Sequence, residues 1–124
     1  MINKILIVDD VMINMTFLEM FFLKHDVTVS KAIQASEVET MIETEKFDVS
    51  LIDYHMPDIN GVTLIRKLQA SQSLHRLGDI YMLTADVEFD PVKAGISKLL
   101  TGSMKKPLDL DKLEAMLFPD QVKE

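Results

Sequence analysis

Short, continuous apolar runs alternate along the chain with longer segments in which apolar residues recur at helical spacing. The first run, Lys4–Val8, is followed at once by two aspartates, which predicts a strand buried on both faces. Further strands are predicted over residues 26–32, 48–52, 79–83 and 100–104. Helices are predicted over residues 12–24, 35–45, 61–70 and 110–117, and another is expected to start at Asp90-Pro91. Strand and helix therefore alternate five times.

This alternation predicts an α/β fold, a doubly wound parallel sheet between two layers of helices. In such sheets, ligands bind beyond the carboxyl ends of the strands. The polar residues that end or follow the predicted strands are Asp9, Asp10, Asp53, Thr84 and Lys106. The sequence therefore predicts that all of this chemistry meets at one rim of the sheet.

Composition narrows the class of protein. With 124 residues, 48% hydrophobic and 27% charged, we expect one globular domain over 1–124, with a core over 3–118 and a tail over 119–124. Cysteine is absent, which excludes disulfides and thiolate metal sites. The net charge of −7 argues against direct nucleic-acid binding, which needs clustered Lys and Arg. No apolar run suits a membrane span or a signal peptide, so we expect a cytoplasmic protein.

Three carboxylates at one rim repel one another unless a cation neutralises them. Mg²⁺ suits hard oxygen ligands and few carboxylates, and Mn²⁺ is an alternative. A carboxylate oxygen of Asp53 could then attack a phosphorus atom in line. The Lys106 ammonium and the Thr84 hydroxyl could stabilise the charge on the equatorial oxygens. Each of these residues by itself could have an ordinary structural role, such as a helix cap or a charged turn. Only their combination is specific for a functional site.

Four motifs resemble those of one family. They are Ile5-Leu-Ile-Val-Asp-Asp10, Asp53-Tyr-His-Met-Pro57 with Gly61, Leu83-Thr-Ala85, and Lys106-Pro107. In this order, they are similar to the motifs of the receiver domain of two-component response regulators and hybrid histidine kinases, of the chemotaxis-regulator type. The resemblance covers residues 3–118 and implies a flavodoxin-like (βα)5 sandwich with strand order 2-1-3-4-5.

The resemblance also implies roles for individual residues. Asp53 would be the phosphoacceptor, and Asp9 and Asp10 would bind Mg²⁺ together with the backbone carbonyl of His55. The alternative is that the His55 side chain, and not its backbone carbonyl, is the metal ligand. His55 and Asp86 would set the lifetime of the aspartyl phosphate. The peptide bond before Pro107 would be cis.

One position departs from the family pattern. The family usually has an aromatic switch residue three positions before the lysine, and here that position is Ser103. A serine has no ring to move, so either another side chain would serve as the switch or phosphorylation would be read at another surface. Gly95, expected inside the fourth helix, would cost about 1 kcal/mol relative to Ala.

The first helix suggests a partner. With Leu18 at the centre of the buried stripe, Asn14, Phe21 and Phe22 fall on the same side. The predicted docking residues are Met12, Ile13, Asn14, Met20 and Leu23, of which the four apolar ones face outward. Receivers dock phosphotransfer modules at this helix, and Asn14 also resembles receivers of hybrid kinases. We therefore expect a sensor histidine kinase or a histidine phosphotransfer protein as partner.

The leading hypothesis is a phosphoacceptor switch that catalyses its own phosphorylation and slow dephosphorylation, and so is not an enzyme in the usual sense. It would signal by contact with an unknown downstream protein, as a monomer or weak homodimer. The alternatives are a non-phosphorylated interaction module of the same fold, an aspartyl-phosphate phosphatase resembling haloacid dehalogenases, and a flavodoxin-like redox carrier. Position 55, where such a phosphatase has its second aspartate, is a histidine in this chain. Asp9 and Asp10 would repel the phosphate of a flavin.

Overall fold

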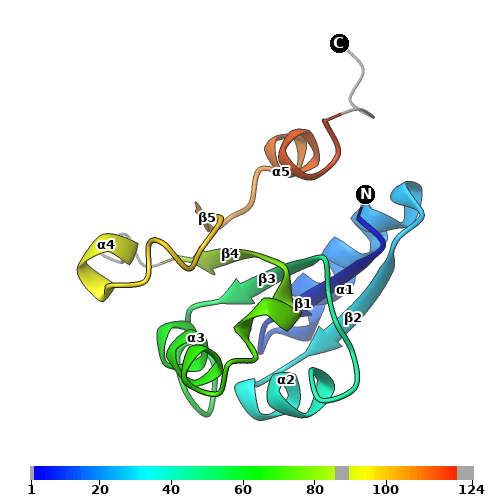
Figure 1. Cartoon of the computed structure of the whole chain (residues 1–124). Helices are drawn as coiled ribbons and strands as arrows, with labels where there is room; N and C mark the ends of the chain where they lie inside the picture. The colour runs from blue at the N-terminus through cyan, green and yellow to red at the C-terminus, as the bar shows by residue number, and fades with distance from the viewer. Residues whose placement is uncertain (1, 86–89, 120–124) are drawn as a thin grey trace.

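Figure 1 shows the computed structural model, which describes residues 2–85 and 90–119. The strands are β1 (Lys4–Val8), β2 (Thr28–Ala32), β3 (Val49–Asp53), β4 (Asp79–Thr84) and β5 (Gly102–Lys105). The helices are α1 (Met12–Phe22), α2 (Ala35–Met41), α3 (Gly61–Ala70), α4 (Pro91–Ala94) and α5 (Leu110–Leu117), with short 3₁₀ turns η1 (Leu23–His25) and η2 (Leu74–Leu77). No helix in these described ranges is long and apolar enough to cross a membrane.

The strands form one sheet in the order β2-β1-β3-β4-β5, with every neighbouring pair parallel. This confirms the predicted fold. Each crossover between parallel strands needs a connection that passes over one face of the sheet, and the helices supply it. The carboxyl ends of all five strands therefore point to the same rim.

Two hydrophobic clusters fill the spaces on either side of the sheet. Alternate residues of β1 face opposite clusters: Ile5 and Ile7 pack with α1 and α5, whereas Leu6 and Val8 pack with α2 and α3. All four are fully buried. Burial on both faces explains why β1 is a continuous apolar run rather than an alternating one.

The buried face of α1 differs from the predicted one. Met15, Leu18 and Phe22 are buried and Phe21 is half-buried, whereas Asn14 is exposed. The placement of Asn14 in the buried stripe was therefore wrong. A helix that is apolar nearly all round does not define one stripe in its sequence, so packing against the sheet selects the stripe through Met15.

The fourth helix starts as predicted but ends early. The Asp90 side chain accepts a hydrogen bond from the Val92 N–H at 2.9 Å, and Pro91 occupies the first turn. Gly95 is not inside the helix. It lies at the C-cap with a left-handed φ of 76°, where glycine is favoured, and it terminates a helix of four residues. The expected cost of an interior glycine therefore does not apply.

Other predicted boundaries shift by a few residues. The second strand starts at Thr28 because Asp26 adopts a left-handed φ of 53° at the end of η1. The helix predicted over 35–45 ends at Met41 and continues as turns. None of these shifts moves a rim residue away from its strand end.

Candidate functional site

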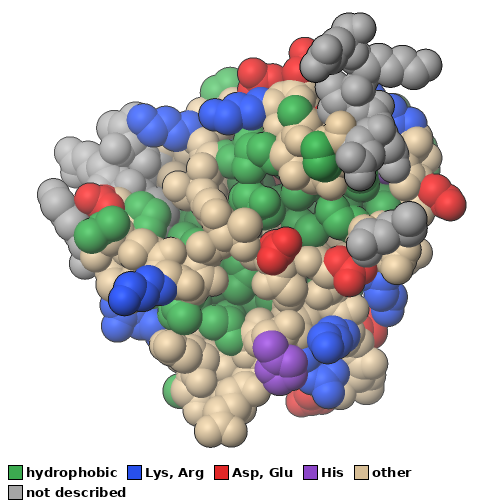
Figure 2. All heavy atoms as spheres, turned by 45° about the horizontal axis from the view of Figure 1, so that its top comes forward, with side chains coloured by type: hydrophobic (Ala, Val, Ile, Leu, Met, Phe, Trp, Pro, Cys, Tyr) green, Lys and Arg blue, Asp and Glu red, His purple; other side chains and the backbone are tan. Residues whose placement is uncertain are grey.

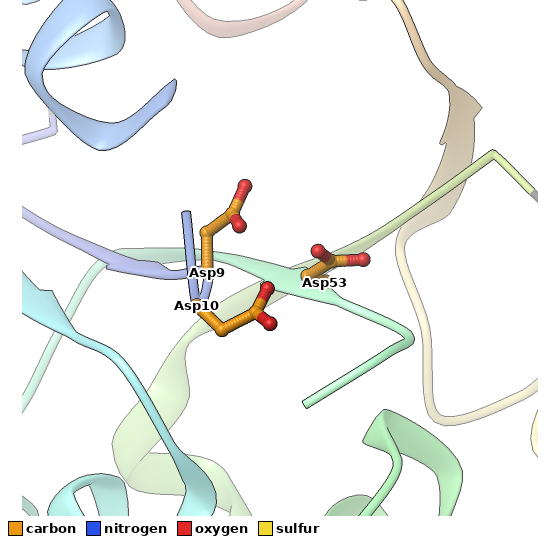
Figure 3. A group of neighbouring side chains, drawn as sticks. All are labelled: Asp9, Asp10 and Asp53. Carbon is orange, nitrogen blue, oxygen red and sulfur yellow. The ribbon is translucent and has the colours of Figure 1, made fainter. Parts of the chain in front are cut away.

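The three predicted carboxylates meet at the rim of the sheet. Asp9 and Asp10 follow β1 directly, and Asp53 is the last residue of β3. Because β1 and β3 are neighbours, with Val8 opposite Ile52, the two strand ends lie side by side. Asp9, Asp10 and Asp53 each offer an oxygen within 4.8 Å of the others. Figure 3 shows their carboxyl groups gathered around one space.

These carboxylates differ in exposure. Asp9 is 1% exposed and Asp53 5% exposed, whereas Asp10 is open to solvent. Burying ionised groups is costly unless an opposite charge or hydrogen bonds compensate. The cluster therefore calls for a cation.

Lys106 supplies part of that positive charge. Its Nζ donates to Oδ2 of Asp9 at 3.0 Å and to Oδ2 of Asp53 at 2.8 Å. The backbone N–H of Lys106 donates to the carbonyl oxygen of Thr84 at 2.9 Å, which fixes the residue after β5 against the end of β4. The bond from Lys106 to Pro107 is cis.

The electrostatics of this pair favour a further cation. Burial raises the pKa of Asp53, Asp9 adds to the increase, and the hydrogen bond from Lys106 only partly opposes it. Burial by itself would lower the pKa of Lys106, but its bonds to Asp53 and Asp9 outweigh that effect and raise it. Lys106 thus stays charged, but its charge does not fully offset the cost of burying the ionised Asp53 carboxylate. A metal ion at the cluster would stabilise the ionised form of Asp53.

Backbone and amide donors hold two of the carboxylates in place. The Val11 N–H donates to Oδ1 of Asp9 at 2.9 Å, and the Asn14 side chain donates to Oδ2 of Asp9 at 3.4 Å. The His55 N–H donates to Oδ1 of Asp53 at 3.3 Å. The contact from Asn14 was not foreseen, although its position in the first turn of α1, next to the Asp9-Asp10 pair, could have indicated it.

The remaining predicted residues lie as follows. Thr84 ends β4 and is buried at the rim. The His55 side chain is exposed, and its ring meets the Tyr54 ring edge-on with centroids 4.8 Å apart. Asp86 lies outside the described residues. Ser103 is exposed on β5, beside the buried Met104.

An open pocket of about 650 Å³ adjoins the cluster. It reaches from Asp9 and Lys106 along α1 to the start of α5, and its lining is mostly apolar. The apolar lining residues are Phe17, Leu18, Leu83, Ala85, Pro107, Leu108 and Leu110. Sequence reasoning missed Phe17, which is 62% exposed on α1 despite its size.

The apolar residues predicted to face outward are exposed. Met12, Ile13, Met20 and Leu23 are 65%, 75%, 65% and 75% exposed, and Asn14 is also exposed. With Phe17 they form what we term the α1 face (Met12, Ile13, Phe17, Met20 and Leu23). It runs from the acidic cluster to η1.

Comparison with known proteins places this geometry in a family. Residues 5–118 match the family model described as "Response regulator receiver domain". The chain is 28% identical over 109 residues to Stress response regulator protein 1 of Debaryomyces hansenii, covering 84% of this chain and 43% of that protein. It is 35% identical over 92 residues to Sensor protein TorS of Escherichia coli, covering 73% of this chain and 9% of that protein. The chain thus spans less than half the length of these relatives.

Solved structures agree on the fold. A CheY-like receiver domain protein from Methanospirillum hungatei superposes with a TM-score of 0.81 at 22% identity, covering 97% of this chain and 94% of that one. The receiver domain of sensor histidine kinase PA1611 from Pseudomonas aeruginosa, solved with a magnesium ion coordinated in its active-site cleft, superposes with a TM-score of 0.78 at 21% identity, covering 94% of each chain. Family match, fold and rim chemistry coincide: this chain belongs to the response regulator receiver domains of two-component signalling systems.

Proposed function

We propose that this domain accepts a phosphoryl group on Asp53 from a phosphohistidine, with Mg²⁺ bound at the acidic cluster. The observation that carries the proposal is the convergence of three carboxylates with Lys106 at a single strand rim. The donor set fits Mg²⁺, because all three side chains offer hard oxygen atoms and Asp10 is open to solvent, where the ion can keep waters. Asp9, Asp10, Asp53 and the His55 carbonyl would hold the ion, and Mn²⁺ is an alternative.

In the transfer step, a carboxylate oxygen of Asp53 attacks phosphorus and forms an acyl phosphate. The bond from phosphorus to the imidazole nitrogen breaks, and its electron pair returns to the imidazole. Lys106 neutralises charge on the phosphoryl oxygens, and the Thr84 hydroxyl donates to one of them. When bound, Mg²⁺ supplies further neutralising charge on the same oxygens. No general base is needed, because the nucleophile reacts as a carboxylate.

The acyl phosphate is later hydrolysed by water, which regenerates Asp53. We propose that His55 and Asp86 set the rate of this hydrolysis, since they follow Asp53 and Thr84 by two positions in the sequence. The His55 side chain is exposed to solvent, from which the attacking water must come. The domain modifies itself once per signal and is not a turnover enzyme.

The α1 face is the proposed docking surface for the phosphodonor. α1 is apolar on both sides, and a helix of this kind is ordinarily covered on both. The face is continuous with the pocket that Asp9 and Lys106 line. A partner helix along α1 would therefore bring its phosphohistidine next to Asp53. Figure 2 shows one face of the molecule, on which hydrophobic side chains gather with acidic and basic side chains among and around them.

We propose a cytoplasmic single domain over 1–124 that works as a monomer or weak homodimer and signals through protein contact. Ser103 favours one second candidate, a receiver-fold module that binds partners without being phosphorylated, because the exposed serine offers no aromatic switch. A Mg²⁺-dependent NMR response to beryllofluoride, which mimics the phosphoryl group, would be expected of the phosphoacceptor and not of the binding module.

The central test is phosphotransfer from a panel of labelled histidine kinases and phosphotransfer proteins. Wild type should be labelled in Mg²⁺ and not after chelation, and Asp53→Asn should take no label. Asp79→Asn is the matched control, because Asp79 is an exposed aspartate at the opposite end of the sheet, at the start of β4. Label retained by Asp53→Asn, or Mg²⁺-independent labelling of wild type, would refute the proposal.

A further inference from the structure

The carboxylate of Asp58 joins two segments that are far apart in sequence. Asp58 lies in the loop between β3 and α3, five residues after Asp53. Its Oδ1 accepts from the Ala35 N–H at 3.0 Å, and its Oδ2 accepts from the Ser36 N–H at 3.0 Å. Oδ1 also accepts from the N–H of Ile59 at 3.0 Å. One side chain thus receives three backbone donors.

Two of those donors are the first N–H groups of α2. The first turn of any helix has N–H groups without intrahelical acceptors, and a nearby negative charge also interacts favourably with the helix dipole. The N-cap residue of α2, Gln34, makes no capping hydrogen bond with its side chain. Glu37 in the first turn accepts instead from the N–H of Ile33, at 2.9 Å. Asp58 therefore serves as the cap of α2 from another part of the chain.

The same side chain anchors the loop that completes the phosphoacceptor site. The ends of this loop are fixed, because the Tyr54 N–H donates to Leu83 O at 2.8 Å and the Gly61 N–H donates to Tyr54 O at 2.7 Å. Between those ends, two residues of the described chain link the loop to other elements by hydrogen bonds. His55 donates to Asp53 of β3, and Asp58 accepts from the first N–H groups of α2. The link to α2 thus restrains the loop next to His55.

We propose that Asp58 is a positioning residue for the phosphoacceptor site. By clasping the β3–α3 loop to α2, it holds the His55 backbone beside Asp53, where the N–H donates to the carboxylate and the carbonyl would be a ligand of the metal ion. This inference rests on the proposed function for the role of the metal ion, whereas the hydrogen bonds that Asp58 accepts are observed directly.

The test separates capping from positioning. Asp58→Ala removes the clasp, and Gln34→Asp in the same chain restores a local cap on α2 without restoring the link to the loop. For each variant we would measure urea unfolding, the Kd for Mg²⁺ by calorimetry, and amide hydrogen exchange of residues 35–37 and 54–60 in the metal-free protein. Asp109→Ala is the matched control, since it deletes the cap of α5, where Asp109 accepts from the Lys112 N–H.

We expect Asp58→Ala to weaken Mg²⁺ binding roughly tenfold, as is typical when a group that orients metal ligands is lost. It should also speed exchange at both segments. Adding Gln34→Asp should restore stability and the protection of 35–37, while Mg²⁺ affinity and the protection of 54–60 stay low. Asp109→Ala should leave Mg²⁺ affinity unchanged.

Unchanged Mg²⁺ affinity in a folded Asp58→Ala protein would overturn the inference, as would recovery of affinity and loop protection with Gln34→Asp. Failure of the wild type to bind Mg²⁺ would instead count against the proposed function. In that case hydrogen exchange of the metal-free protein still decides whether Asp58 restrains residues 54–60.

Discussion

The ammonium nitrogen of Lys106 lies 2.8 Å from Oδ2 of Asp53 and donates a hydrogen bond to it. The ammonium therefore lies directly beside the carboxylate that is the proposed phosphoacceptor. It also competes with a metal ion for the same negative charge. Lys106 thus stabilises the buried carboxylates of Asp9 and Asp53, and in the proposed transfer step it would also neutralise the phosphoryl oxygens.

Replacing Lys106 by Met should separate these two effects. We expect tighter Mg²⁺ binding, because the ion no longer competes with the ammonium, and phosphotransfer slower by roughly 100-fold, because a charge that stabilises the transition state is lost. Calorimetry and transfer kinetics measure the two quantities. Lys105→Met is the control, because Lys105 is an exposed neighbour on β5. An unchanged transfer rate in Lys106→Met would exclude Lys106 from the chemistry.

Phosphodonor docking should depend on the α1 face. Phe17→Glu, or Met20→Glu with Leu23→Glu, should weaken donor binding by about 2 kcal/mol, roughly thirtyfold in Kd. Transfer should slow at donor concentrations below Kd. Stability should change by less than about 0.5 kcal/mol, because these side chains are exposed.

Val92→Glu is the matched control for docking, since Val92 on α4 is 72% exposed and lies outside the α1 face. Phosphotransfer from a small-molecule donor such as acetyl phosphate provides a second control, since it needs no docking. Equal losses with Val92→Glu and Phe17→Glu would show that the face has no special role.

Asp48 should make the stability of the folded protein depend on pH. Its Oδ2 accepts from the N–H groups of Asn3 and Lys4 at 2.8 and 2.9 Å, and these bonds hold its pKa below the usual value. Since the folded pKa is lower than the unfolded one, the stabilisation is complete above about pH 4 and is lost as pH falls through the folded pKa. We expect Asp48→Asn to cost about 1 kcal/mol at pH 7, allowing for solvent screening.

Urea unfolding at pH 7, 5 and 3 checks the Asp48 prediction. The difference between wild type and Asp48→Asn should persist at pH 5 and shrink at pH 3. Glu43→Gln, at an exposed position in the turn after α2, should show a much smaller effect. A difference between wild type and Asp48→Asn that grows as pH falls would contradict the prediction.

Substituting alanine for each of the two glycines with positive φ should destabilise the fold by different amounts. Gly78 has a φ of 65°, and an added Cβ would overlap the backbone of Phe47 and Asp48, which lie just before β3. We expect Gly78→Ala to destabilise the fold by about 3 kcal/mol, because neither backbone segment can yield. At Gly95 the nearest atom to a new Cβ is a side-chain nitrogen of Arg66, so Gly95→Ala should cost about 1 kcal/mol.

Thermal and urea unfolding of the two alanine variants provide the measurement. Gly95→Ala also probes the C-terminal end of α4, where Arg66 donates to the carbonyl of Ala94. Equal destabilisation at the two glycines would mean that backbone overlap at Gly78 is relieved by movement of the preceding loop.

The sequence by itself determined the sheet and the residues at its rim. Continuous apolar runs identified the buried strands, and parallel strands necessarily bring their carboxyl ends to one edge. The meeting of Asp9, Asp10, Asp53, Thr84 and Lys106 followed from strand order alone. These features depend on local pattern and on a topology that few connections satisfy, so the tertiary structure confirmed their placement without altering it.

Only the tertiary structure decided which side of α1 is buried and what holds the loop after Asp53. A helix that is apolar nearly all round packs by whichever face fits, and that face runs through Met15 and leaves Phe17 on the surface. The hydrogen bond from the Ala35 N–H to the Asp58 carboxylate joins residues 23 positions apart. The sequence does not show which distant helix a loop carboxylate will cap, because the contact exists only once the chain has folded.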